Sequence, residues 1–446
     1  MKKSIYILLL LALTVSKTVN AQNVQIKGKL KDFDNQVLVE DFSELQYLKA
    51  ADPLYLVKPD SSGNFSISLP VRSPNYFRIG RNILYLTPGD NLVVSIDHKN
   101  PELSFFTGRG SAANNYLRFT PFPKGGSFIN SGKALKSDPA LTISVIHDAA
   151  ATRLAQLDTL TGVTPAFKQL ETARVRADVI NSLLSVQNYY MRSLKLKGDT
   201  AKTYLNTYNR LAMPEVKKEF INFANAGLLR LTVYRDIAEE IILEPNVRKS
   251  EVQQIRDWIR STELADQMRK INDKYLLVDF KDSIAKIHTI TYQKALNNML
   301  KALLAFGKGD KAVDFTANDS DGKPVALSSL KGKIIYIDLW ATWCGPCMAE
   351  MPALNKLKAL YQQNPHVVFV SLSIDDGTAV WKQSIGQRKS DGLQWLINRN
   401  KLSAYQVNTI PRALLINQDF SVVDLNAPLP SSPQTSLLIN KLLNIN

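Results

Sequence analysis

A nearly continuous apolar run of six residues leads almost directly into the only two cysteines of this 446-residue chain. The run, Ile334 to Leu339, is followed by Trp343-Cys344-Gly345-Pro346-Cys347. Such a nearly continuous apolar segment is typical of a strand that is buried on both faces of a sheet. A helix is expected from about Cys347 to Gln362. The sequence therefore places two thiols between a buried strand and the N-terminus of a helix.

Strands and helices alternate through the rest of this region. Residues 367–372 predict a second buried strand, 378–387 a second helix, and 412–417 with 421–425 a closing hairpin. Strand, helix, strand, helix and hairpin make an α/β layer fold. A polar, glycine-bearing hinge at 306–310 opens this domain, which is expected to span 306–446.

The chain before this domain is too long to fold as one domain, and its hydrophobic pattern changes once, from strand-like alternation to helical spacing. Residues 24–30 and 64–69 alternate apolar with polar side chains, and further strands are expected at 83–86 and 92–96. These features predict a β-rich N-terminal domain, 22–120, built as a small sandwich or barrel.

Residues 121–305 predict an α-helical domain. Apolar side chains there are spaced three and four apart, as at Ile146, Ala150, Leu154 and Leu157. Two long stretches, 179–196 and 284–306, carry few helix breakers. Three prolines are expected where helices begin or connect: Pro165, Pro214 and Pro245.

The first 21 residues have the pattern of a cleaved secretory signal peptide. Lys2 and Lys3 precede an apolar run of about 11 residues, which is shorter than the ~20 needed to span a bilayer as a helix, and Val19-Asn20-Ala21 follows. No cysteine lies at the cleavage point, so lipidation is not expected. We expect a soluble product in the periplasm or cell envelope.

The charge of the chain does not indicate a nucleic-acid partner. Its 55 Lys and Arg against 40 Asp and Glu give +15, and a signal peptide carrying three lysines would leave +12. The two signs are interspersed, without the dense basic run of a nucleic-acid groove. We interpret the excess as a basic, solvated surface.

The spacing of Cys344 and Cys347 points to chemistry, because cysteines this close cannot link distant parts of a fold. A helix N-terminus favours a thiolate, so Cys344 is expected to be exposed and to attack a substrate disulfide, and Cys347 to resolve the mixed disulfide. Gly345 would permit a tight approach, and Pro346 lacks an N–H where the helix would leave one unpaired.

A metal site is the alternative use of such a pair. There is no second pair of cysteines, and the four histidines are scattered: His98, His147, His288 and His366. We therefore expect no metal and no cofactor other than the Cys344–Cys347 disulfide. Asp375-Asp376 is interpreted as a loop at a strand end.

Three further stretches belong with the cysteine pair: Asp338 to Cys347 as a whole, Ala312-Val313-Asp314-Phe315 with 327–332, and Thr409-Ile410-Pro411. On these motifs, residues from about 310 to 446 resemble the thioredoxin superfamily, and within it the exported TlpA/ResA-like thiol-disulfide oxidoreductases. The first stretch is similar to the active-site stretch of the family, and the second resembles an added N-terminal strand and loop. The N-terminal region resembles, more weakly, β-domains that precede thioredoxin domains in exported proteins of the Bacteroidetes type.

The resemblance implies four catalytic residues. Cys344 would be the attacking thiol and Cys347 the resolving thiol. Asp338 matches a buried carboxylate that exchanges a proton with the resolving thiol, and Glu350 matches an acidic residue of the ResA-like branch with a similar role. From the residues alone, Asp338 could instead mark a solvated strand end, and Glu350 an ordinary residue of a first helical turn.

The resemblance also implies a substrate-binding surface. Pro411 would be cis and lie against the cysteine pair, although an Ile-Pro bond is usually trans. The backbone of Ile410 would pair with the substrate as an added strand. Trp343, with Trp340, would flank the site, and Gly345 and Pro346 would complete it.

The predicted function is the reduction or isomerisation of disulfides in envelope proteins. Its expected partners are proteins that carry disulfides or thiols and a membrane-linked thiol reductant, and a homodimer through the first two domains is compatible with the sequence. The Gly345-Pro346 pair is the thioredoxin-like choice and favours reduction, while a disulfide oxidase stays open. A different class also stays open, an envelope binding or scaffold protein with an accessory redox domain, which an apolar groove in the first 300 residues would favour.

Overall fold

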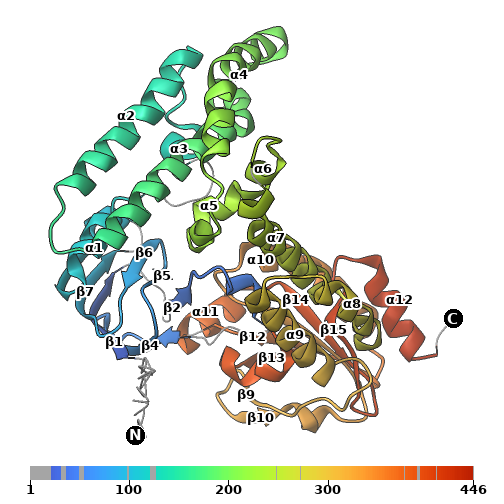
Figure 1. Cartoon of the computed structure of the whole chain (residues 1–446). Helices are drawn as coiled ribbons and strands as arrows, with labels where there is room; N and C mark the ends of the chain where they lie inside the picture. Colours follow the sequence, from blue (N-terminus) through green and yellow to red (C-terminus); the bar gives the residue numbers. More distant parts are fainter. Residues whose placement is uncertain are drawn as a thin grey trace, which may run out of the picture.

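Figure 1 shows three parts along the chain: a β-rich part in blue, a helical part in green, and an α/β part in orange and red. The predicted multidomain arrangement is confirmed, while its exact boundaries stay predictions. The predicted signal peptide, 1–21, lies outside the residues that the structure describes. This computed structural model describes residues 22–31, 37–49, 55–97, 100–120, 127–247, 249–271, 273–375, 377–388, 392–407 and 409–444.

The described strands of the β-rich part form two four-stranded sheets, in the orders β4-β1-β7-β8 and β3-β2-β5-β6. Their bounds are β1 Gln22–Lys31, β2 Val37–Asp41, β3 Tyr55–Val57, β4 Asn64–Val71, β5 Asn75–Ile79, β6 Asn82–Leu86, β7 Asn91–Asp97 and β8 Phe105–Arg109. The 3-10 helices η1, Gln46–Leu48, and η2, Pro101–Leu103, and the helix α1, Ser111–Leu117, accompany them.

The alternation read from the sequence is the reason these strands form a sandwich. In β1, Val24 and Ile26 are fully buried, and they share one apolar core with Leu69 of β4 and Val39 of β2, so the two sheets pack face to face. Gly28 lies where β1 runs parallel to β7. A Cβ there would approach the backbone oxygen of Val94 to 1.8 Å, so only glycine fits.

The regular secondary structure described in the second part is all helical. Its α-helices are α2 Pro139–Asp158, α3 Pro165–Ser193, α4 Gly198–Ile221, α5 Thr232–Asp236, α6 Ala238–Leu243, α7 Lys249–Lys270, α8 Phe280–Ala285 and α9 Ile290–Ala305. Its 3-10 helices are η3 Ser127–Gly132, η4 Ala226–Arg230 and η5 Lys274–Asp279. Pro165 lies in the first turn of α3, as predicted, and the Thr164 hydroxyl caps that helix by accepting from the N–H of Phe167.

One prediction for this part is wrong. Pro214 lies inside α4 and not at a helix start, because buried apolar residues on both sides, such as Ala212 and Val216, hold the helix together across the missing hydrogen bond. The stretch 284–306, which carries few helix breakers, is helical as predicted but divided between α8 and α9. The N–H and hydroxyl of Thr289 both donate to Asp257 of α7, at 2.6 and 2.7 Å, which turns the chain between α8 and α9.

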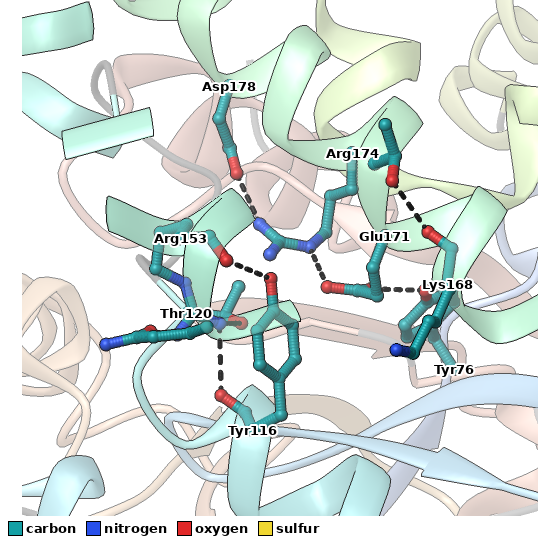
Figure 2. Close-up of polar contacts among 10 residues, drawn as sticks. Tyr76, Tyr116, Thr120, Arg153, Lys168, Glu171, Arg174 and Asp178 are labelled. Carbon is teal, nitrogen blue, oxygen red and sulfur yellow. Dashed lines mark hydrogen bonds and ion pairs between the residues drawn. The ribbon is translucent and has the colours of Figure 1, made fainter. Parts of the chain in front are cut away.

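A buried polar network joins the β-rich part to the helices (Figure 2). Tyr76 of β5 donates to Glu171 of α3, and Arg174 binds both Glu171 and Asp178 on its own helix. Glu171 is fully buried and Asp178 is 1% exposed. Burial raises the pKa of Asp178 to about 6 against the opposing pull of Arg174. Charged groups this deep need their partners, so the network fixes how β5 and α3 meet.

The third part is built on a seven-stranded sheet in the order β10-β9-β13-β12-β11-β14-β15. The strands are β9 Thr316–Asn318, β10 Pro324–Ala326, β11 Ile334–Trp340, β12 Val367–Ser373, β13 Leu393–Leu396, β14 Arg412–Ile416 and β15 Val422–Ala427. The helices are η6 Leu327–Leu330, α10 Gly345–Leu360, α11 Thr378–Arg388, η7 Arg399–Tyr405 and α12 Pro433–Leu442.

Helices cover both faces of this sheet. Leu354 and Leu357 of α10 and Ile439 of α12 pack with Tyr336 on one face. Trp381 of α11 and Leu402 and Tyr405 of η7 pack in a second apolar cluster on the other face. β11 runs parallel to β12 and antiparallel to β14, and all seven of its residues are buried. The predicted central strand is therefore confirmed.

The added N-terminal strand lies further along the chain than predicted. Residues 312–315 are not a strand, because the Asp314 carboxylate accepts from the N–H of its neighbour Phe315 and from Ser328, which bends the chain. The strand is β9, Thr316–Asn318. The closing hairpin is present, but α12 after it was not predicted. Within the part of the chain that is described, no helix is both long and apolar enough to cross a membrane.

Candidate active site

The turn that follows β11 is held by the strand beside it. The N–H of Ile374, just after β12, donates to the carbonyl of Trp340 at 2.9 Å. The N–H of Thr342 lies 2.9 Å from both carboxylate oxygens of Asp375, and its hydroxyl donates to Oδ1 at 2.7 Å. Ser373 adds its hydroxyl to the same carboxylate at 2.8 Å. The segment that presents Cys344 is therefore tied to β12.

Asp375 is the residue whose importance sequence reasoning missed. It was interpreted only as part of a strand-end loop, yet it is 6% exposed and carries the contacts that fix the turn. The available signal was its place shortly after the second buried strand, since neighbouring parallel strands end at the same edge of a sheet. Its neighbour Asp376 lies outside the described residues.

Cys344 and Cys347 form a disulfide, with Cα atoms 5.2 Å apart. Cys344 is the N-cap of α10, and its sulfur accepts from the N–H of Cys347 at 3.2 Å. The helix thus begins at Gly345, two residues earlier than predicted. The unpaired N–H groups at the start of the helix and the positive end of the helix dipole point toward a sulfur in this position. Both stabilise a thiolate.

The expectation that Cys344 is exposed is wrong for this disulfide form. Cys344 is 4% exposed and Cys347 3%, because both pack into the apolar cluster that includes Trp340. The exposed part of the site is its rim. Trp343 is 56% exposed, and Gly345 and Pro346 are exposed as well.

Gly345 is not required by the packing of this chain. Outside its chain neighbours and the backbone of its own helix, a Cβ at Gly345 would meet no atom within 4 Å, and its backbone is not in the left-handed region. The space beside it is therefore open to a second molecule. Pro346 lies in the first turn of α10, where a missing N–H costs little.

Asp338 lies in β11, the strand that leads to this site, in the middle of the sheet. It stands opposite Ser371 of β12 and Ala413 of β14 and is 4% exposed, so the alternative of a solvated strand end does not hold. Burial raises its pKa to about 7, Lys358 of α10 opposes this shift, and Glu350 adds to it. A carboxyl group with a pKa near 7 can both bind and release a proton at neutral pH.

Glu350 raises the pKa of Asp338 and also accepts hydrogen bonds from a second residue. Its two carboxylate oxygens accept from the N–H and the hydroxyl of Ser431, at 2.9 and 2.8 Å. Ser431 lies just before α12, so this contact ties α10 to the loop that leads into α12. Glu350 and Lys358 thus act on Asp338 from the same helix with opposite signs.

The Ile410–Pro411 peptide bond is cis, as the family resemblance implied. Ile410 is partly buried against the apolar cluster that contains Cys344 and Cys347. Arg412, directly after Pro411, was not singled out from the sequence. Its guanidinium donates to the carbonyls of Leu425 and Gln406, at 2.7 Å each, and burial lowers its pKa to about 10. These bonds connect the cis-proline loop to β15 and to the end of η7.

Comparisons with known proteins identify the family to which this domain is similar. The Redoxin family matches residues 307–431. Thiol-disulfide oxidoreductase ResA of Bacillus thuringiensis (strain Al Hakam) is 32% identical over 120 residues, which cover 26% of this chain and 67% of that protein. ResA of Bacillus subtilis (strain 168) is 33% identical over 124 residues, 27% of this chain and 66% of that protein.

One solved structure matches a similar share of this chain. A candidate thiol-disulfide oxidoreductase from Bacteroides vulgatus is 38% identical, covers 30% of this chain and 96% of that one, and superposes with a TM-score of 0.29. The predicted thioredoxin-like enzyme domain rests on the Redoxin match, the two ResA relatives and the buried Cys344–Cys347 pair at the start of α10. The chain belongs to the ResA-like thiol-disulfide oxidoreductases of the thioredoxin superfamily.

Proposed function

We propose that this enzyme reduces or isomerises disulfides of proteins in the cell envelope through Cys344 and Cys347. The observation that carries the proposal is the Cys344–Cys347 disulfide at the start of α10. The strand that leads to it carries the buried Asp338, whose pKa is about 7. The signal-peptide pattern of residues 1–21 supports an envelope location.

The reaction proceeds by two thiol-disulfide exchanges. In the reduced enzyme, the Cys344 thiolate attacks one sulfur of the substrate disulfide, forming a mixed disulfide and releasing the other substrate sulfur as a thiolate. Cys347 then gives up its proton and attacks the Cys344 sulfur. The bond to the substrate breaks, the second substrate thiol leaves, and the enzyme holds the Cys344–Cys347 disulfide. Two electrons pass from enzyme to substrate.

Asp338 supplies the proton acceptor for the second exchange. Its carboxylate takes the proton of Cys347 as that thiol attacks, and a pKa near the working pH suits the transfer in both directions. Glu350 and Lys358 tune this group through their charges. Trp343, Gly345 and Pro346 form the exposed rim over which the substrate lies, and the backbone of Ile410, beside cis-Pro411, pairs with it as an added strand.

The direction of electron flow follows from the Gly345-Pro346 dipeptide, which is the thioredoxin-like choice between the cysteines. In this direction the disulfide must be reduced again after each turnover. We propose that a membrane-linked thiol donor does so, because the cytosolic reductant pool is absent from the envelope.

The test is the reduction potential of the Cys344–Cys347 pair, measured by equilibration with dithiothreitol or glutathione. We expect a value closer to the roughly −270 mV of thioredoxin than to the roughly −120 mV of DsbA. Cys344→Ser should abolish the couple, and Cys347→Ser should accumulate a mixed disulfide with an oxidised protein substrate. A potential near that of DsbA would make the enzyme an oxidase, and the absence of any couple would favour a binding protein.

A further inference from the structure

The end of α9, in the helical part, meets the end of η7, in the redox domain. Ala302 carries one of the last four carbonyls of α9, which have no partner inside a helix. The side-chain amide of Gln406 donates to this carbonyl at 3.1 Å. Next to it, the rings of Phe306 and Tyr405 meet edge to face, with centroids 5.4 Å apart. Two consecutive residues of the redox domain, Tyr405 and Gln406, therefore contact the end of α9.

Gln406 bonds to both parts at once. Its carbonyl accepts from the guanidinium of Arg412 at 2.7 Å, while its side chain reaches Ala302. Its φ of 49° and ψ of 44° lie in the left-handed region, which residues other than glycine rarely adopt. A backbone that its surroundings hold in an uncommon conformation is often found at functional positions. Here the conformation serves two hydrogen bonds that point to different domains.

Arg412 carries this connection to the redox pair. It directly follows cis-Pro411, opens β14 and stands opposite Leu339 of β11, the strand that leads to the cysteines. Its guanidinium also donates to the carbonyl of Leu425 in β15 at 2.7 Å. On the other side of Pro411, Ile410 packs against the apolar cluster that contains the cysteine pair. The position of Arg412 therefore bears on the loop beside the redox pair.

The end of η7 also borders open space. A cleft of about 900 Å³ lies where the three parts of the chain meet, and Gln406 and Arg412 both line it. Its other walls are formed by β2 and η1 of the β-rich part and by α7, η5 and the end of α9. Because the cleft leaves less protein packed against this segment, hydrogen bonds carry more of its positioning.

We propose that Gln406 is a positioning residue, through which the contact with α9 fixes the loop of cis-Pro411 for catalysis. The helical part then supports the active site of the redox domain and is more than a spacer. The inference rests on the proposed function, because this loop is where the substrate backbone is proposed to pair.

The test variant is Gln406→Glu in the full-length enzyme. The new side chain has the same length, but a carboxylate cannot donate to the carbonyl of Ala302 and is repelled by it. The rate constant kcat/KM is measured for two substrates, bis(2-hydroxyethyl) disulfide and a synthetic peptide closed by one intramolecular disulfide. We expect the value for the peptide to fall about ten-fold, because a misplaced loop misaligns a paired backbone. The small disulfide has no backbone to pair and should change less than about two-fold.

Two further variants separate positioning from general damage. Gln406→Lys keeps a donor that can reach the same carbonyl and suits the C-terminus of a helix, so it should restore the ratio of the two rate constants. Lys308→Gln breaks an exposed ion pair with Asp273, at 3.2 Å, which joins the linker after α9 to the start of η5. It loosens the same domain contact without involving η7 and should keep the ratio of the parent.

Hydrogen exchange gives a second readout that does not depend on turnover. Peptides from the segment 409–416 should exchange faster in Gln406→Glu than in the parent, and at the parental rate in Gln406→Lys and Lys308→Gln. An unchanged ratio in Gln406→Glu, or an equal loss for both disulfides, would overturn the inference. A parent enzyme that reduces neither disulfide would overturn the proposed function instead, and the exchange rates would still show whether Gln406 links α9 to the loop.

Discussion

Asp375 receives both polar groups of Thr342, its N–H at 2.9 Å and its hydroxyl at 2.7 Å, and so ties the turn before Cys344 to the end of β12. The carboxylate is 6% exposed, and the hydroxyl of Ser373 also donates to it. A charged acceptor bound by three donors in a buried site holds its partners firmly. Asp375 is thus a positioning residue for Cys344.

We expect Thr342→Val to lower kcat/KM for a disulfide substrate by about ten-fold, because the lost hydroxyl bond lets the turn move, and to cost about 1 kcal/mol of stability. The pKa of the Cys344 thiol, followed by the pH dependence of its alkylation, should rise as the sulfur loses its alignment with the start of α10. Thr342→Ser keeps the hydroxyl and should restore both values. An unchanged thiol pKa in Thr342→Val would leave Asp375 a purely structural role.

The buried carboxyl of Asp338 should make the oxidised enzyme less stable as the pH rises. Its pKa is about 7 in the folded protein against an ordinary value of 3.8, so the folded state binds its proton more tightly between these values. The free energy of unfolding should therefore fall as pH rises from about 4 to 7 and level off above, by about 4 kcal/mol at about 1.36 kcal/mol for each pKa unit.

Asp338→Asn removes this dependence. The variant should be more stable than the parent at pH 8 and similar to it at pH 4, in urea unfolding followed by tryptophan fluorescence. Four of the five tryptophans report on the redox domain: Trp340, Trp343, Trp381 and Trp395. If the free energy of unfolding changes equally with pH in the two proteins, burial of the Asp338 charge does not destabilise the folded enzyme.

Glu350 and Lys358 should move the pKa of Asp338 in opposite directions. The charge of Glu350 raises it and that of Lys358 lowers it, so Glu350→Gln should lower the pKa and Lys358→Met should raise it. The measurement is the pH profile of the resolving step, in which Cys347 displaces a substrate trapped on Cys344. Ser431→Ala separates the two roles of Glu350, because it removes a hydrogen bond and leaves the charge. Shifts of the same sign in both charge variants would contradict this account.

Loss of Arg174 should unfold the contact between the β-rich part and α3. Arg174→Ala leaves Glu171 and Asp178 buried without their cation, which costs about 3–5 kcal/mol. Arg260→Ala breaks an exposed pair with Glu263 and should cost less than about 1 kcal/mol. Thermal unfolding compares the two. A loss in Arg174→Ala no larger than in Arg260→Ala would show that the network does not support the fold.

Local pattern was a good guide where one interaction dominates. The run from Ile334 to Leu339 indicated a buried strand, and the alternation at Val24 and Ile26 marked one face of a sheet. Local pattern was a poor guide where a residue distant in the sequence determines the local backbone conformation. Thr289 turns the chain because Asp257, 32 positions earlier, accepts its N–H, and Asp314 bends the strand predicted at 312–315 by binding Ser328.

The sequence by itself determined the chemistry: two cysteines at the start of a helix, a carboxyl group in a buried strand, and an Ile-Pro step, all set by the order of residues within short segments. Only the tertiary structure decided how these are supported. Packing between segments far apart in sequence produces the hydrogen bonds of Asp375 with Thr342. It also produces the opposed charges of Glu350 and Lys358 around Asp338, and the cleft shared by three parts of the chain. No local pattern encodes such contacts, because each is fixed by the fold as a whole.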